Sequence, residues 1–261
     1  MAEQATLLDR QVEFFLNQRL SPSRLAEVPA ALKPADADSA YAVLAGVHAG
    51  LAATGHRRVG YKIGCTTSKT QAAQRTDHPT WAGLFEADRY RTIGGAIRNI
   101  ARPFAIECEI VMLLGKDIDD PAALSDERLT DAIQSCAVGC ELVVNRYGDP
   151  LARGLPTLIA DDFFQAAFVV GPPNDHWRNL DLSKLAADVR VDGRVVETGV
   201  TSTVMGNPLH ALRWLVADQA SRGMRLHAGD IIFSGSATTP YWLDEAPHSV
   251  EIRIEALGSL T

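Results

Sequence analysis

Two glutamates are separated by a single residue within an apolar stretch of the chain, Phe104-Ala-Ile-Glu-Cys-Glu-Ile-Val-Met-Leu-Leu114. On an extended strand, Glu107 and Glu109 share one face, with their Cα atoms about 6.5 to 7 Å apart. No Lys or Arg interrupts the stretch, so these two like charges need positive charge from elsewhere. The pattern predicts a cation site. The alternative is a pair of glutamates that simply face water.

A third acid, Glu141, lies in equally apolar surroundings. It follows Cys136-Ala-Val-Gly-Cys140 and precedes Leu142-Val-Val144, so an ionised carboxylate there also needs a partner. One possibility is a strand-end carboxylate paired with Arg146 or Arg153. The other is a third ligand for the cation. Three carboxylate ligands without histidine or thiolate suit Mg²⁺ or Mn²⁺ better than Zn²⁺.

Two further segments could contact a ligand. Lys62 lies between glycines in Gly60-Tyr-Lys-Ile-Gly64. It is either a surface lysine with a snorkelling stem or a cation that receives a substrate carboxylate close to the metal. Gly235 and Ser236 belong to a loop of small residues that follows a strand. Such a loop can hydrogen-bond a ligand, and it can equally be a plain turn.

Composition excludes several other classes of protein. The 261 residues, 46% hydrophobic and 22% charged, predict a compact protein with a substantial core. A formal net charge of −7 argues against nucleic acid as a partner. The N-terminus resembles no secretion signal, no apolar stretch is long enough to cross a membrane, and no two of the four cysteines form a C-x-x-C pair. We therefore expect a cytoplasmic protein with free thiols.

Helical spacing of apolar residues predicts helices over 7–20, from Asp38 to Gly55, and near 126–138. Asn207 and Pro208 are typical of the N-cap and first position of a helix that ends at Gly223. Residues 188–197 read as a β-hairpin that turns at Asp192-Gly193. The other β-prone runs are 59–64, 105–114, 142–145, 166–170, 230–234 and 249–257.

Strands that occur in runs and hairpins favour an α+β architecture around a mixed or antiparallel sheet over a doubly wound one. We predict a helical region over residues 1–55 and a metal-binding catalytic region over residues 56–261, joined in one compact unit. The chain has no dinucleotide or phosphate-binding glycine motif and no serine-hydrolase elbow.

Taken in order, the motifs resemble the 2-keto-4-pentenoate hydratase and 4-oxalocrotonate decarboxylase family, a branch of the fumarylacetoacetate hydrolase superfamily. The segments that carry the resemblance are 60–64, 106–110, Glu141, Met-Gly-Asn-Pro-Leu at 205–209 and Gly-Asp-Ile-Ile-Phe-Ser-Gly-Ser at 229–236. The resemblance implies a mixed β-roll core with N-terminal helices, and a small 2-oxo acid as substrate. It also implies Mg²⁺ or Mn²⁺ on Glu107, Glu109 and Glu141, with Lys62 near the substrate. It further implies a homo-oligomer, with a complex with a pathway partner enzyme left open.

The chain departs from that family at two positions. Thr80 follows Pro79 where hydratases of this type carry an acid/base aspartate, and Ala160-Asp-Asp-Phe-Phe164 replaces Ala-Asp-Asn-Ala. Asp77, Glu86, Asp88 and Asp162 are the possible substitutes. We assign catalysis to Lys62, Asp77 and Glu86, and substrate binding to Lys62, Thr80, Asp162, Gly235 and Ser236.

The activity predicted from this resemblance is hydration of a 2-hydroxy-2,4-dienoate to a 4-hydroxy-2-oxo acid. The alternatives are decarboxylation of a 2-oxo-3-enedioate, C–C bond hydrolysis as in the wider superfamily, and a non-catalytic partner subunit. A distal pocket that is apolar favours the hydratase, whereas a cationic one favours the decarboxylase. The candidate cations are Arg57, Arg58, Arg146 and Arg153.

Overall fold

The computed structural model describes residues 6–21, 27–90, 103–118, 124–147, 154–245 and 247–261. A large curled sheet is formed by β1 (Arg58–Gly64), β2 (Thr80–Phe85), β3 (Arg89–Tyr90), β4 (Phe104–Leu114), β5 (Ile133–Val144), β6 (Gln165–Val170), β9 (Ile231–Ser236) and β10 (Tyr241–Leu243). A smaller sheet is formed by β7 (Ala186–Val191), β8 (Arg194–Val200), β11 (Val250–Ile254) and β12 (Gly258–Leu260). The described helices are α1 (Leu7–Leu20), α2 (Ala37–Ala53), α3 (Ser68–Gln74), α4 (Asp126–Ala132), α5 (Leu155–Ala160) and α6 (Pro208–Ser221).

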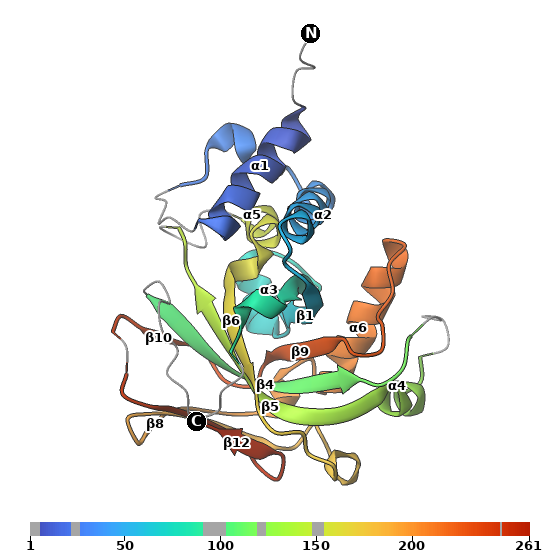
Figure 1. The fold of residues 1–261 in the computed structure, drawn as a ribbon. Helices are drawn as coiled ribbons and strands as arrows, with labels where there is room; N and C mark the ends of the chain where they lie inside the picture. The colour runs from blue at the N-terminus through green and yellow to red at the C-terminus, as the bar shows by residue number, and fades with distance from the viewer. Residues whose placement is uncertain (1–5, 22–26, 91–102, 119–123, 148–153, 246) are drawn as a thin grey trace.

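The large sheet is mixed. Its strand order is β2-β1-β9-β4-β5-β6-β3, with β10 paired to β4. The pairs β1/β9 and β3/β6 are parallel, and the remaining pairs are antiparallel. The small sheet lies below β4 and β5 in Figure 1, and apolar side chains from both sheets share one core. The predicted α+β fold with a mixed β-roll is confirmed.

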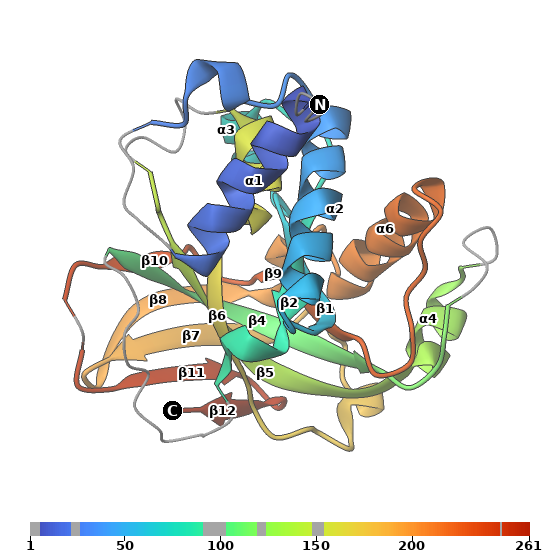
Figure 2. The ribbon, with the colours of Figure 1, turned by 45° about the horizontal axis from the view of Figure 1, so that its top comes forward.

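The N-terminal helices and the small sheet lie at opposite ends of the molecule, with the large curled sheet between them (Figures 1 and 2). Capping boxes at Thr6 and Asp36 begin α1 and α2 by satisfying their first amides. The two helices pack closely because α2 carries glycine at the contact: a Cβ on Gly46 would lie 2.4 Å from a methyl of Val12. None of the described helices combines the length and apolarity that a membrane-spanning helix needs.

Several local predictions are confirmed. Helix α1 has the predicted bounds, and the side chain of Asn207 accepts from the amide of Leu209 at the start of α6. The turn between β7 and β8 has Asp192 at φ 50° and Gly193 at φ 77°, as a type I′ turn requires. The division of the chain at residues 55 and 56 stays a prediction.

The helix predicted near residues 126–138 is wrong beyond its first half. Helix α4 ends at Ala132, and the chain continues directly as β5, which pairs along its whole length with β4. The reason is tertiary: the long ladder to β4 and burial of both faces outweigh local helical spacing. Strand β2, which carries Thr80, was not predicted.

Candidate active site

Two adjacent strands of the large sheet bring the three glutamates together. Glu107 on β4 lies directly opposite Glu141 on β5 in the antiparallel register, and Glu109 lies opposite Gly139. One carboxylate oxygen from each glutamate lies within 4.8 Å of the others. Oxygens that bind one octahedral ion at about 2.1 Å lie about 3 Å apart when adjacent, so small rotations of the side chains would close the set.

The three carboxyl groups are poorly solvated. Glu109 is 1% exposed and Glu141 is 0% exposed, while Glu107 is partly buried. Burial, followed by the charges of the neighbouring glutamates, raises the pKa of Glu109 well above its usual range. Burial also raises the pKa of Glu107, and it raises that of Glu141 to about 8 despite the nearby lysine. A bound divalent cation would remove this repulsion, so the donor set fits one.

Lys62 on β1 lies beside this cluster. Its Nζ is 2.8 Å from Glu141 Oε1 and donates to the carbonyl oxygen of Phe163 at 2.8 Å. Burial alone would lower the pKa of Lys62, but the charges of Glu141 and Glu107 raise it. An ammonium group has three donors, so one remains for a ligand.

Strand β9 contributes the small residues that were predicted to contact a ligand. The amide of Gly235 donates to Glu109 Oε2 at 2.7 Å. Glycine is required there, because φ is +109° and a Cβ would lie 2.4 Å from Thr66 Oγ1. Ser236 lies opposite Glu109 in the ladder, and its buried hydroxyl has no hydrogen-bond partner among the described residues.

Thr80 lies on the same face of the sheet as Lys62. The register pairs Thr80 with Gly64 and Lys62 with Ala82, and residues two apart on a strand share a face. The side chain of Thr80 is completely buried, and a Cβ on Gly64 would lie 3.2 Å from its Oγ1. A hydroxyl therefore occupies the position where the resemblance leads one to expect an aspartate.

Two predicted catalytic acids are not brought to the cluster. Asp77 is exposed in the loop before β2, and no hydrogen bond or ion pair of the described residues joins it to the glutamates. Glu86 follows the far end of β2, where it pairs with Arg57 at 3.4 Å. Thr80 and Glu86 are six residue steps apart along the chain, which is about 20 Å when the chain is extended. Their catalytic assignment stays a prediction that this placement does not favour.

None of the candidate cations within the described residues pairs with Glu141. Arg146 is buried and binds Asp161 at 2.7 Å, so it is not the partner of Glu141. Arg57 and Arg58 are exposed, and the guanidinium of Arg58 lies over the ring of Tyr61. Arg153 lies outside the described residues.

Asp162 begins an unusual turn. Asp162, Phe163 and Phe164 have φ values of 53°, 49° and 65°, so three consecutive non-glycine residues are left-handed. Each such residue costs about 1 kcal/mol or more, and bonds elsewhere must compensate. Asp162 Oδ1 provides two of them, because it accepts from the amide of Gly83 and from His48 Nε2, both at 2.8 Å.

The carboxylate of Asp162 is therefore engaged by the protein. Arg19 Nε lies 3.6 Å from its second oxygen, and Asp88 is held by the same arginine at 3.1 Å. Burial would raise the pKa of Asp162, but His48, Arg19 and the Gly83 amide lower it to about 2. This placement does not favour direct substrate contact by Asp162. It favours a structural part for Asp162 beside the site.

Sequence reasoning missed the contacts that hold this turn. The sequence separation between His48 and Asp162 is 114 residues, and nothing in the spacing of the histidines links them. The carbonyl of Phe163 carries no side-chain signal at all. The only hint was the aspartate at residue 162, where a neutral asparagine was expected.

Comparison with known proteins gives consistent results. A 4-oxalocrotonate decarboxylase from a Pseudomonas species is 32% identical over 209 residues, covering 79% of this chain and 78% of the decarboxylase. A 2-keto-4-pentenoate hydratase from Paraburkholderia phymatum is 30% identical over 242 residues, covering 92% of this chain and 90% of the hydratase. Both relatives are lyases.

Solved structures show the same fold. The 4-oxalocrotonate decarboxylase from Pseudomonas putida G7, solved with calcium and acetate, aligns with a TM-score of 0.85 at 24% identity, covering 99% of this chain and 98% of that one. A second structure of that decarboxylase holds magnesium and adipate. The model of the fumarylacetoacetate (FAA) hydrolase C-terminal family matches residues 66–261. The chain therefore belongs to the FAA hydrolase family.

Proposed function

We propose that the chain is a divalent-metal-dependent hydratase that converts a 2-hydroxy-2,4-dienoate into a 4-hydroxy-2-oxo acid. The observation that carries this proposal is the convergence of Glu107, Glu109 and Glu141 within 4.8 Å, with Lys62 Nζ 2.8 Å from Glu141. An anionic oxygen cluster beside a buried cation suits a metal ion and a carboxylate-bearing substrate together.

Mg²⁺ or Mn²⁺ is the proposed ion. All three ligands are hard carboxylate oxygens, and none of the buried cysteines or the histidines is among them. The magnesium in the structure of the related decarboxylase supports this choice. When bound, such an ion would act as a Lewis acid on the 2-oxo group of the substrate and stabilise its enolate form.

The protein's own groups would orient the substrate and handle protons. Lys62 has one donor left for the substrate carboxylate or its 2-oxygen, and the amide of Gly235 fixes Glu109. The hydroxyls of Thr80 and Ser236 are buried, and each can donate or accept a proton in a hydrogen bond. We assign Lys62 as the acid/base candidate, because it is the titratable cation on this face of the sheet among the described residues.

The hydratase is favoured over the decarboxylase by the described groups around Lys62. The ring of Phe163 lies 5.3 Å from Lys62 Nζ and gives an apolar wall. Among the described candidate cations for a second carboxylate, Arg146 is paired with Asp161, and Arg57 and Arg58 are exposed. The decarboxylase stays the second candidate, because the relative with that activity is 32% identical.

The direct test measures substrate consumption. We expect the protein with added Mg²⁺ or Mn²⁺ to consume 2-hydroxypenta-2,4-dienoate, followed by loss of its ultraviolet absorbance, and to release little CO₂ from a 2-oxo-3-enedioate. Glu109→Gln changes one of the three clustered glutamates and should lose this turnover, and Glu251→Gln, which changes a glutamate on β11, is its matched control. Faster turnover of the enedioate would reverse the assignment in favour of the decarboxylase. Metal binding without turnover of either substrate would contradict both.

The remaining proposals concern the assembly. We infer that the protein acts as a homo-oligomer in the cytoplasm, and a complex with a pathway partner enzyme stays open. The resemblance described above supports the oligomer. Size-exclusion chromatography with light scattering would measure the oligomer directly.

A further inference from the structure

The left-handed turn at residues 162–164 runs beside the outer edge of the large sheet. Strand β2 is the last strand on that side, so its outward-facing amides have no neighbouring strand among the described residues. The amide of Gly83 donates instead to Asp162 Oδ1 at 2.8 Å. The turn therefore contacts the sheet at its edge, from which it can reach groups on both faces.

The two faces of β1 and β2 carry different groups. Lys62 and its partner Ala82 point to the face with the three glutamates, whereas Tyr61 and its partner Gly83 point to the other face. His48 packs on that other face: a Cβ on Gly83 would lie 2.6 Å from His48 Cε1. His48 and Lys62 are therefore separated by the sheet and cannot contact one substrate.

One short segment nevertheless connects them. His48 Nε2 binds Asp162, and the carbonyl of the next residue, Phe163, accepts from Lys62 Nζ at 2.8 Å. Ionised Asp162 can only accept, so His48 Nε2 carries the proton in this contact. Because left-handed residues are strained, the conformation of the turn depends on such bonds.

We propose that His48 and Asp162 are positioning residues for Lys62, acting from the opposite face of the sheet through the Phe163 carbonyl. This inference rests on the proposed function in one respect, namely that Lys62 receives the carboxylate of the ligand. It gives helix α2, which carries His48 but none of the clustered glutamates, a role in positioning Lys62. It also explains the aspartate at residue 162, whose Oδ1 accepts from His48 Nε2 and whose charge is matched by Arg19.

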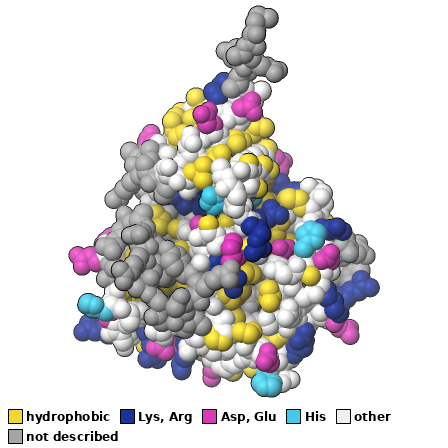
Figure 3. Space-filling view, viewed as in Figure 1, with side chains coloured by type: hydrophobic (Ala, Val, Ile, Leu, Met, Phe, Trp, Pro, Cys, Tyr) yellow, Lys and Arg dark blue, Asp and Glu magenta, His cyan; other side chains and the backbone are white. Residues whose placement is uncertain are grey.

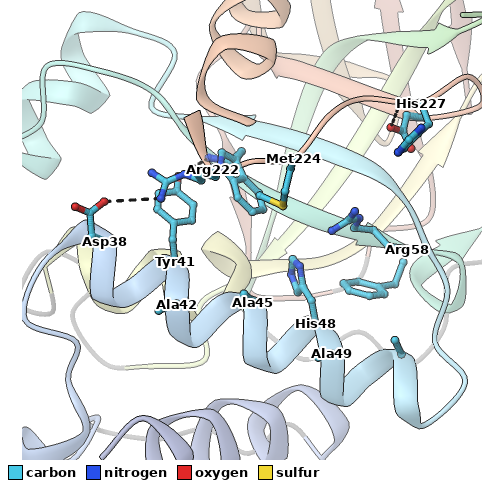
Figure 4. A pocket seen from close by; sticks show the side chains of 14 residues that line it. Asp38, Tyr41, Ala42, Ala45, His48, Ala49, Arg58, Arg222, Met224 and His227 are labelled. Atoms are coloured by element: carbon cyan, nitrogen blue, oxygen red, sulfur yellow. Dashed lines mark hydrogen bonds and ion pairs between the residues drawn. The ribbon is translucent and has the colours of Figure 1, made fainter. Parts of the chain in front are cut away.

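The side chain of His48 borders a pocket. His48, Tyr41 and Arg58 line this pocket beside α2 (Figure 4), and its volume of about 780 Å³ leaves room for a replacement side chain. In the space-filling view, basic, acidic and histidine side chains gather where the helical part meets the sheet (Figure 3). The contact between His48 and Asp162 is thus open to conservative substitution.

The test compares two amides of different length. The side-chain nitrogen of glutamine can take the place of His48 Nε2, whereas that of asparagine is one methylene short. With Mn²⁺-saturated protein and oxalate as probe, we expect His48→Asn to weaken oxalate binding by about tenfold and His48→Gln by less than about threefold. Mn²⁺ affinity without oxalate should change by less than about threefold in both variants.

The measurements are calorimetric titration of oxalate and electron paramagnetic resonance of free Mn²⁺, neither of which needs turnover. His56→Gln, a change just beyond α2, is the matched control. Equal oxalate affinity of His48→Asn and His48→Gln would overturn the positioning role, as would a parallel loss of Mn²⁺ affinity. If the wild-type protein binds oxalate but consumes no dienoate, the proposed reaction is wrong and the positioning role is still decided by the two variants.

Discussion

Lys62 Nζ lies 2.8 Å from Glu141 Oε1, in an ion pair whose side chains are only 3% and 1% exposed. Replacing one member of a buried ion pair leaves the charge of the other uncompensated. A substitution at only one of these two residues is therefore destabilising. Here the partner belongs to a cluster of three carboxylates, and the lysine neutralises only part of their charge. The pair therefore links the binding of a metal ion to the position of the ammonium group.

Lys62→Met should separate these two effects. We expect kcat to fall by about 10²- to 10³-fold, because the substrate loses its cationic partner. Mn²⁺ affinity should not weaken, because the ammonium competes with the ion for Glu141. Kinetics and paramagnetic resonance measure the two quantities. Lys116→Met, at an exposed lysine paired with Asp131, is the control. A clear loss of Mn²⁺ affinity would instead mean that Lys62 holds the carboxylates in place.

Glu109→Gln tests the ligand set. Glutamine can still accept from the Gly235 amide, so the loop should stay in place while one negative charge is lost. We expect Mn²⁺ affinity to fall by about 100-fold, measured by isothermal titration. The same change at Glu251 should leave the affinity unaltered. Full retention of affinity in Glu109→Gln would remove this residue from the metal site.

The stability of the metal-free protein should fall as pH rises through neutrality. The folded-state pKa of Glu141 is raised to about 8 from 4.5, so between these values the folded state binds more protons than the unfolded state. Ion binding needs the deprotonated carboxylates, so the rise in Tm on adding Mg²⁺ should be larger at pH 8 than at pH 5.5. Differential scanning calorimetry measures both trends. A metal effect independent of pH would contradict the raised pKa.

The contribution of Asp162 to stability should depend on pH in the opposite direction. Its folded-state pKa is lowered from 3.8 to about 2, so its contribution is present above pH 4 and is lost as pH falls toward 2. Asp162→Asn should lower the free energy of unfolding by about 2 kcal/mol at pH 7, and by less at pH 3. Urea titrations at the two pH values measure this. Asp181→Asn, at an exposed aspartate, should have a smaller effect because solvent screens its partners.

The part of the site that follows from strand alternation could be predicted. The period of two places Glu107 and Glu109 on one face whatever the rest of the fold does. Glu141 was recognised by its apolar surroundings, although its position opposite Glu107 depends on the register between β4 and β5. That register is set by long-range pairing. The same pairing explains why residues 133–138, for which a helix was predicted, form a strand.

The contacts behind Lys62 could not be predicted. They join residues from α1, α2, β2 and the turn at 162–164, which are far apart in sequence. Backbone groups supply two of them, the Gly83 amide and the Phe163 carbonyl, and backbone groups are the same at every residue. Left-handed φ at Phe163 and Phe164 also runs against the preference of bulky side chains.

The covering of β2 has a consequence for solubility. Two outward-facing amides of this edge strand donate to side chains, that of Trp81 to Tyr41 Oη at 3.1 Å and that of Gly83 to Asp162. An uncovered edge would offer these amides to a strand of another molecule and so promote aggregation. The side chains of Tyr41 and Asp162 thus take the place of a missing neighbour strand for these two amides, which are then not offered to a strand of a second chain.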